Sequence, residues 1–110
     1  FKTIVLVNER KQYWVFCLPT DRSINMKKAR SLTGSKALEL VKLTEIQNVT
    51  GYLRGGCSPI GMKRPFPTFI EEAAFSLPFI YVSAGKRGMQ VRLDPSDLLR
   101  SVDGERADFT

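Results

Sequence analysis

The sequence contains no histidine, and this absence excludes a large class of catalytic sites. A Ser-His or Cys-His pair needs an imidazole as its base, so neither pair can be built from these residues. Cysteine is nearly as scarce: the chain has only Cys17 and Cys57, forty positions apart. Two such cysteines form neither a disulfide framework nor a zinc site, which is typical of a reducing cytoplasm.

Long hydrophobic runs are also missing. No apolar run approaches the ~20 residues that cross a bilayer, and no leader resembles a signal peptide, so no membrane partner is expected. The chain has 110 residues, 43% hydrophobic and 25% charged, as in one ordinary soluble globular domain. It opens at Phe1 inside an apparent strand, without a methionine. We therefore expect a domain at residues 1–102 that lacks its amino-terminal part, followed by a frayed tail at 103–110.

The charge balance is strongly basic. Lys and Arg number 17 against 11 acidic residues, for a net charge of +6 and a pI near 9.6. Such an excess suits a polyanionic partner, because neutralised phosphates release counterions. A merely basic soluble protein explains the same charge, so the composition leaves both interpretations open.

The hydrophobic pattern predicts an α+β fold. Residues 2–7 and 12–18 are apolar runs separated by a polar turn, which favours an antiparallel hairpin that stops at Pro19. Strands are also expected at 36–41, 79–84 and 89–93, and helical segments at 24–32, 45–49 and 94–102, while 68–75 is expected to start as a strand and to turn helical towards its end. Together these elements predict a compact mixed, mostly antiparallel sheet with short surrounding helices.

Local signals support the helix boundaries. Gly34 and Gly51 are expected to end two helices, and Thr44 with Gln47 matches a capping box for the second. Asp94 before Pro95 is a strong start for the last helix.

The segment 51–67, "GYLRGGCSPIGMKRPFP", is rich in glycine, proline and basic residues. Its backbone N–H groups lack obstructing Cβ atoms, so it could surround a carbonyl, carboxylate or phosphate with donors. It matches neither the Walker pattern nor the dinucleotide fingerprint. A ligand-binding loop and an ordinary wide turn both remain open.

Cys57 lies in the middle of this loop. A nucleophilic cysteine needs a lowered pKa and usually a base. No histidine is present, although Lys63 or Arg64 could lower the thiol pKa. Small filler is therefore the favoured role for Cys57, and Cys17, among bulky apolar residues on a strand, is expected in the core.

Other charged residues give weaker signals. Lys2 precedes an apolar strand and by itself indicates only a solvated edge charge, and Asp21 is a further acid near apolar elements. Glu71 and Glu72 are neighbours on a predicted strand and point to opposite faces, so a carboxylate dyad is not expected. Basic residues cluster on two glycine-bearing loops. If the two loops lie side by side, these residues form one positive rim suited to a nucleic-acid backbone. The alternative is two separate, solvated loops. The basic residues are Arg54, Lys63, Arg64, Lys86 and Arg87.

Two stretches carry a family resemblance. "TGYLRGGCSPIGMKRPFPTFIEE" and "IYVSAGKRGMQVRLDPSDLLR" resemble the bacterial YbaK-type Cys-tRNA deacylases, relatives of the editing domain of prolyl-tRNA synthetases. The likeness is dense over residues 50–100 and extends more loosely to Phe1. It implies a partly barrel-like sheet and hydrolysis of mischarged aminoacyl-tRNA in trans, with Cys-tRNA(Pro) as substrate. It also implies no cofactor or metal, a cytoplasmic location, and prolyl-tRNA synthetase as a further partner.

The resemblance also implies site residues. The essential lysine of the family falls on Lys2, as the catalytic residue, and the attacking group comes from the substrate itself. The five loop cations listed above would contact tRNA. Departures from the family are Glu71, where aspartate is frequent, and Cys57, whose position accepts other small residues. The substrate-binding positions are Gly55, Gly56, Ser58, Pro59, Ile60, Gly61 and Gly85, with Gly88 completing the second glycine pattern.

Two other functions stay open. One is a non-catalytic module of the same fold that binds tRNA or a synthetase. The other is the editing domain of a full synthetase, which is disfavoured because the chain ends shortly after its last predicted helix.

Overall fold

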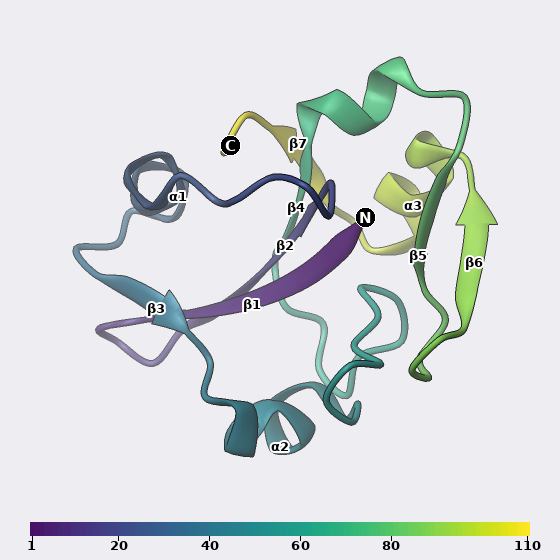
Figure 1. Ribbon diagram of the computed structural model, residues 1–110. Helices are drawn as coiled ribbons and strands as arrows, with labels where there is room; N and C mark the ends of the chain where they lie inside the picture. Colours follow the sequence, from purple (N-terminus) through teal and green to yellow (C-terminus); the bar gives the residue numbers. More distant parts are fainter.

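A computed structural model describes all of residues 1–110 (Figure 1). None of its helices combines the length and hydrophobicity needed to cross a membrane. The elements are β1 (Lys2–Asn8), β2 (Tyr13–Leu18), α1 (Met26–Thr33), β3 (Leu38–Leu40), the 3-10 helix η1 (Leu43–Glu45), α2 (Ile46–Thr50), β4 (Thr68–Glu71), the 3-10 helix η2 (Glu72–Ser76), β5 (Ile80–Ser83), β6 (Gln90–Leu93), α3 (Pro95–Ser101) and β7 (Glu105–Ala107).

The strands form two sheets. The larger has the order β3-β1-β2-β4-β7, and β5 with β6 forms a separate hairpin. β1 pairs antiparallel with β2 and β3, β5 pairs antiparallel with β6, and β4 pairs parallel with β2 and β7. Three of the five pairings are therefore antiparallel, which confirms the predicted mixed, mostly antiparallel α+β fold.

Alternation along β1 divides the core between two faces of the sheet. Leu6 packs on one face with Phe16 and Ala29 of α1. Val5 packs on the opposite face, in the cluster that also contains Cys57. Because side chains alternate along a strand, Lys2 lies on the Leu6 face. The catalytic candidate and the glycine-rich loop therefore start from opposite faces of β1.

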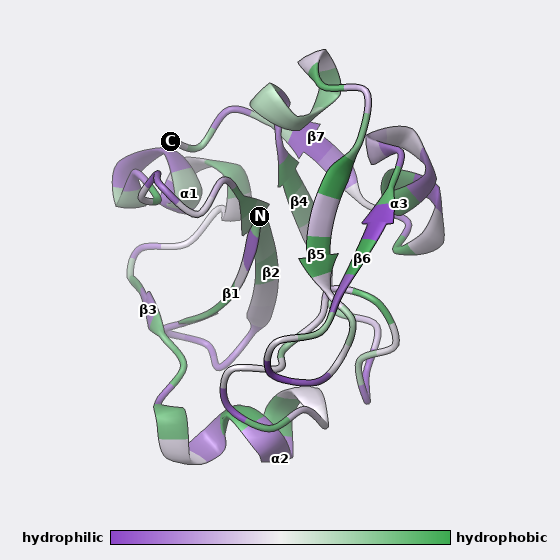
Figure 2. Ribbon diagram, turned by 45° about the vertical axis from the view of Figure 1, so that its right-hand side comes forward, coloured by the Kyte–Doolittle hydropathy of each residue, from purple (hydrophilic) through white to green (hydrophobic).

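The carboxyl-terminal tail is ordered, so the expectation that residues 103–110 are frayed is wrong. β7 pairs with β4, and the backbone N–H of Phe109 donates to Glu71 Oε2 at 2.9 Å. The Phe109 side chain is fully buried against Phe16, with ring centroids 5.0 Å apart. Figure 2 shows hydrophobic colour on β4 and hydrophilic colour on β7 at the sheet edge. The sequence did not indicate β7 because three residues, two of them charged, are too short for a hydrophobic pattern. Its partner strand β4 also lies far away in the sequence.

Most helix boundaries are confirmed. Gly34 caps α1 with a positive φ of 64°, and the Asp94 side chain accepts from Ser96 N at 2.7 Å to begin α3. The capping box of Thr44 and Gln47 does not form. Thr44 lies inside η1, and the residue that precedes α2 makes no side-chain cap bond, because the chain enters this helix through a 3-10 turn.

Candidate functional site

The two glycine-bearing loops lie against each other, near the turn between β5 and β6 (Figures 1 and 2). A Cβ added at Gly56 would lie 3.1 Å from both Gly85 O and Lys86 Cα, and 3.2 Å from Arg87 N. The backbones of the loops are therefore in close contact at a position where any side chain would press on residues 85–87. Gly55, at φ 84°, brings its Cα beside the guanidinium of Arg87 in the same way.

This contact brings together three of the five predicted loop cations. Arg54 and Lys86 each line a hollow that also contains Gly55, and Arg87 packs on Gly55 directly. The other two lie elsewhere: Lys63 packs beside Gly51, and Arg64 lines a separate cavity. All five are exposed and none takes part in an ion pair. The positive rim suggested by the sequence thus consists of Arg54, Lys86 and Arg87.

Three separate hollows with shared lining residues lie between Lys2 and this rim, each with a volume of about 220 to 230 Å³. The first and second share Ile4 and Leu40, and the second and third share Gly55. The first is lined by Lys2, Ile4, Leu6, Ser23, Ile24, Met26 and Leu40. The second is lined by Thr3, Ile4, Val5, Leu40, Val41, Leu43, Ile46, Arg54, Gly55 and Cys57. The third is lined by Gly55, Ser83, Lys86, Gly88, Met89 and Gln90.

Lys2 is half-buried at the start of β1 and makes no ion pair. The hollow that it lines contains none of the predicted loop residues, so the structure does not bring Lys2 into one cavity with them. Ile4 and Leu40 line both its hollow and the one at Gly55, so the two hollows lie on either side of these residues. A substrate that reaches both would lie across the edge of β1.

The middle of the loop is held inside the protein. Ser58 is 2% exposed, and its Oγ accepts from Ile60 N at 3.2 Å, so its hydroxyl shapes the turn. Pro59 is buried, and Ile60 packs against the core cluster under β5. These three predicted substrate-binding residues therefore have local structural contacts of their own.

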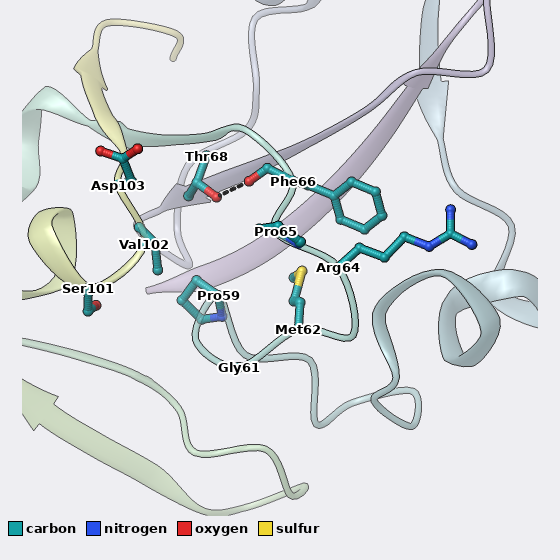
Figure 3. A pocket seen from close by; sticks show the side chains of 10 residues that line it. All are labelled: Pro59, Gly61, Met62, Arg64, Pro65, Phe66, Thr68, Ser101, Val102 and Asp103. Atoms are coloured by element: carbon teal, nitrogen blue, oxygen red, sulfur yellow. Dashed lines mark hydrogen bonds between the residues drawn. The ribbon is translucent and has the colours of Figure 1, made fainter.

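A cavity of about 240 Å³ lies between the loop and the end of α3 (Figure 3). It contains Pro59, Gly61 and Arg64 from the predicted site, and Thr68 Oγ1 donates there to the carbonyl of Phe66. The predicted residues are thus divided between hollows at Gly55 and this cavity. Its lining residues are Pro59, Gly61, Met62, Arg64, Pro65, Phe66, Thr68, Ser101, Val102 and Asp103.

Neither cysteine has the properties of a nucleophile. Burial raises the pKa of the Cys57 thiol, and this outweighs the hydrogen bond with the Thr50 side chain, which lowers it. Burial raises the pKa of Cys17, which is fully buried, to about 12. Both thiols therefore stay protonated near neutral pH, in agreement with core and filler roles.

Sequence reasoning missed three residues at the site. Ser83 and Gln90 are paired across β5 and β6 and line the hollow at Gly55. Tyr52 lies between the two loops, within reach of Gly61 and Gly85. An aromatic residue directly after the glycine that begins the loop was the available signal for Tyr52, whereas Ser83 and Gln90 carry no signal until the register of the hairpin is known.

Comparison with known proteins places this geometry in a family. The model of the aminoacyl-tRNA editing domain matches residues 1–101. The chain belongs to this family. This editing domain is 43% identical over 110 residues to EbsC of Enterococcus faecalis, described as a candidate Cys-tRNA(Pro)/Cys-tRNA(Cys) deacylase, and covers 67% of that protein.

Solved structures share the fold of the editing domain. The crystal structure of a candidate trans-editing enzyme for prolyl-tRNA synthetase matches with a TM-score of 0.90 and 25% identity, over 99% of this chain and 68% of that one. A hypothetical protein matches with a TM-score of 0.90 and 20% identity, over 98% of this chain and 71% of that one, and shows the fold alone.

Proposed function

We propose that this editing domain hydrolyses the ester of mischarged aminoacyl-tRNA in trans, with Cys-tRNA(Pro) as its substrate. The observation that carries the proposal is the contact of the two glycine-bearing loops at Gly56, within an editing-family chain. Backbone groups and the unpaired cations Arg54, Lys86 and Arg87 meet there around one hollow. Such a site suits the phosphates and the aminoacyl ester at a tRNA 3′ end.

The chemistry requires no protein nucleophile. The reaction breaks the bond between the acyl carbon and the ribose oxygen, consumes water, and releases the free amino acid and the tRNA hydroxyl. An aminoacyl ester is already activated, so positioning and polarisation of its carbonyl supply most of the acceleration. The substrate itself assists the attack. The cysteinyl thiol displaces the ribose oxygen to form a cyclic thioester that water then opens, or a ribose hydroxyl activates the water that attacks the acyl carbon. The raised pKa of the Cys57 thiol supports this assignment.

Lys2 and the loop have separate roles in this mechanism. Lys2 anchors the terminal phosphate or the carbonyl oxygen, while backbone N–H groups of residues 55–61 hold the aminoacyl group. The lining residues that neighbouring hollows share, Ile4, Leu40 and Gly55, support contact of one substrate with both regions.

Selection among amino acids then rests on space. A pocket closed by the loop excludes larger side chains sterically. This discriminates more strongly than binding affinity, in which one methylene group changes the free energy by only about 1–3 kcal/mol. The reaction takes place in the cytoplasm, where tRNA is charged, and prolyl-tRNA synthetase is the proposed partner that releases the mischarged tRNA. The name of the solved trans-editing enzyme supports this partner.

Deacylation of a panel of mischarged tRNAs tests the function. We expect hydrolysis of Cys-tRNA(Pro) to exceed that of Ala-tRNA(Pro) and correctly charged Pro-tRNA(Pro). Salt-dependent tRNA binding without hydrolysis of any ester would instead identify a non-catalytic tRNA-binding module.

A further inference from the structure

The backbone of Tyr52 is held in place by hydrogen bonds to the end of α2. Its N–H donates to Thr50 Oγ1 at 3.1 Å, and that hydroxyl donates to Ile46 O at 2.8 Å inside α2. Thr50 is 1% exposed, so the anchor belongs to the packed end of the helix. The Tyr52 side chain therefore projects from a rigid element into the space between the loops.

The side chain contacts both loops. Its hydroxyl donates to the carbonyl of Ile60 in the first loop. A Cβ added at Gly61 would lie 3.0 Å from that hydroxyl oxygen, and a Cβ added at Gly85 would lie 3.0 Å from ring carbon Cε1. Gly61 and Gly85 therefore each leave room for a different part of one tyrosine.

The loops thus have two points of contact. Gly56 meets the backbone of residues 85–87 directly, and Tyr52 fills the space between Gly61 and Gly85. The hollow that contains Gly55 and Lys86 takes its walls from both loops, so its width depends on their separation.

We propose that Tyr52 is a positioning residue that sets the separation of the two loops and thereby the alignment of the aminoacyl group. The proposal rests on the proposed deacylase function, because the hollow is assigned to the aminoacyl end. Tyr52 acts through loop geometry without touching the reacting atoms. A displacement of 1 Å at a reacting centre can lower the rate by about 10²-fold, so a single lost loop contact is measurable in kcat.

The first experiment compares Tyr52→Phe with wild type on Cys-tRNA(Pro). The phenylalanine keeps the ring against Gly85 and removes only the hydrogen bond to Ile60. We expect kcat to fall roughly 3- to 10-fold while KM changes by less than about 2-fold, because the exposed cations that hold the tRNA are untouched. Tyr13→Phe is the matched control: its ring lies tilted against Phe66 with the ring centroids 5.4 Å apart, its hydroxyl forms no hydrogen bond within the protein, and kcat should not change.

A double-mutant cycle separates positioning from general loss of stability. Ala at Gly61 meets the Tyr52 hydroxyl, so Gly61→Ala should lower kcat less in the Tyr52→Phe background than in wild type. Gly85→Ala meets the ring, which phenylalanine retains, so its effect should be the same in both backgrounds. The strain of a positive φ at each glycine is common to both backgrounds and cancels.

The outcomes are distinct. Wild-type protein that hydrolyses no ester overturns the proposed function, and with it a role for Tyr52 in hydrolysis. Active wild type with unchanged kcat in Tyr52→Phe, or with equal effects of Gly61→Ala in both backgrounds, overturns the positioning role alone. A third outcome is a fall in kcat that accompanies a lowered melting temperature and disappears when the assay is cooled. This outcome assigns Tyr52 to stability and also overturns the positioning role.

Discussion

Several charged groups beside the five-stranded sheet form ion pairs, whereas the cations on the glycine-bearing loops form none. Arg106 pairs with Glu72 at 2.9 Å beside the sheet, and Lys28 pairs with Asp108 at 3.0 Å. Lys86 and Arg87 are exposed and have no carboxylate partner. Unpaired cations contribute little to folding, but they remain available to a polyanion.

The two regions also use backbone contact differently. In the sheet, strand pairing and buried side chains fix the structure, and the carboxylate of Glu71, 3% exposed, holds the tail through Phe109 N. Between the loops, the backbones approach through Gly56, with little side-chain packing besides Tyr52. Changes in the sheet should therefore reduce stability, and changes in the loops should reduce activity.

The largest effect is expected for Phe109→Ala in the sheet region. The side chain is fully buried and lies 5.0 Å from Phe16. Its loss should lower the free energy of unfolding by about 3–5 kcal/mol, measured by urea denaturation. Asp108→Ala is the control: it removes only an exposed ion pair, worth about 1 kcal/mol or less. A loss below about 1 kcal/mol for Phe109→Ala would show that the tail contributes little to folding.

Lys2→Ala should have the next largest effect, and on activity alone. Removal of a charge that polarises or anchors the ester should lower kcat/KM for Cys-tRNA(Pro) by roughly 10²- to 10³-fold. The unfolding free energy should change by less than about 1 kcal/mol, because Lys2 makes no ion pair. Lys27→Ala, at an exposed position on α1, is the control. Near-normal turnover by Lys2→Ala would contradict the assignment of Lys2.

The sequence was a good guide to the sheet because apolar runs bounded by turn residues indicate buried strands. Such runs and their turns predict the hairpin of β1 and β2 and that of β5 and β6. β7 escaped prediction because its three residues are recognised only through pairing with β4 and the buried Glu71. Its stability comes from tertiary contacts that local sequence does not encode.

The site was predicted less completely. Glycine content indicated two loops, but their contact depends on how β4 and the β5–β6 hairpin are arranged. Distance along the chain could not show that Lys63 and Arg64 lie apart from Lys86. Nor could it show that alternation on β1 turns Lys2 toward the α1 face. Such placements follow from tertiary packing, which the sequence alone does not reveal.

A smaller effect is expected when the loop cations are removed. The double variant Lys86→Ala/Arg87→Ala should raise KM for aminoacyl-tRNA roughly 3- to 10-fold. The slope of log Kd against log salt concentration should fall by about two, because about two fewer counterions are released on binding. Lys27→Ala/Lys36→Ala changes the net charge equally at exposed positions outside both loops and should leave KM nearly unchanged. Equal effects of the two double variants would mean that net charge, rather than the rim, attracts tRNA.

The smallest effect is expected for Cys57→Ala. Burial raises the pKa of this thiol above its ordinary value of 9.0, so it remains protonated at neutral pH and cannot act as a thiolate. Activity should stay within about 3-fold of wild type from pH 6 to 9, whereas a nucleophilic role predicts its loss.

Stability gives an independent check on Cys57. A thiol kept neutral by burial contributes stability below pH 9.0 that is lost as the pH rises toward its folded pKa, because the unfolded thiol ionises first. Cys57→Ala should therefore lose less stability above pH 9.0 than wild type, although Cys17 still contributes in the same direction. Steady activity combined with this flatter pH dependence would exclude Cys57 as the nucleophile and leave the attack to a group of the substrate. An equally steep pH dependence would show that the Cys57 thiol is not shielded by the fold, and would reopen its role in the loop.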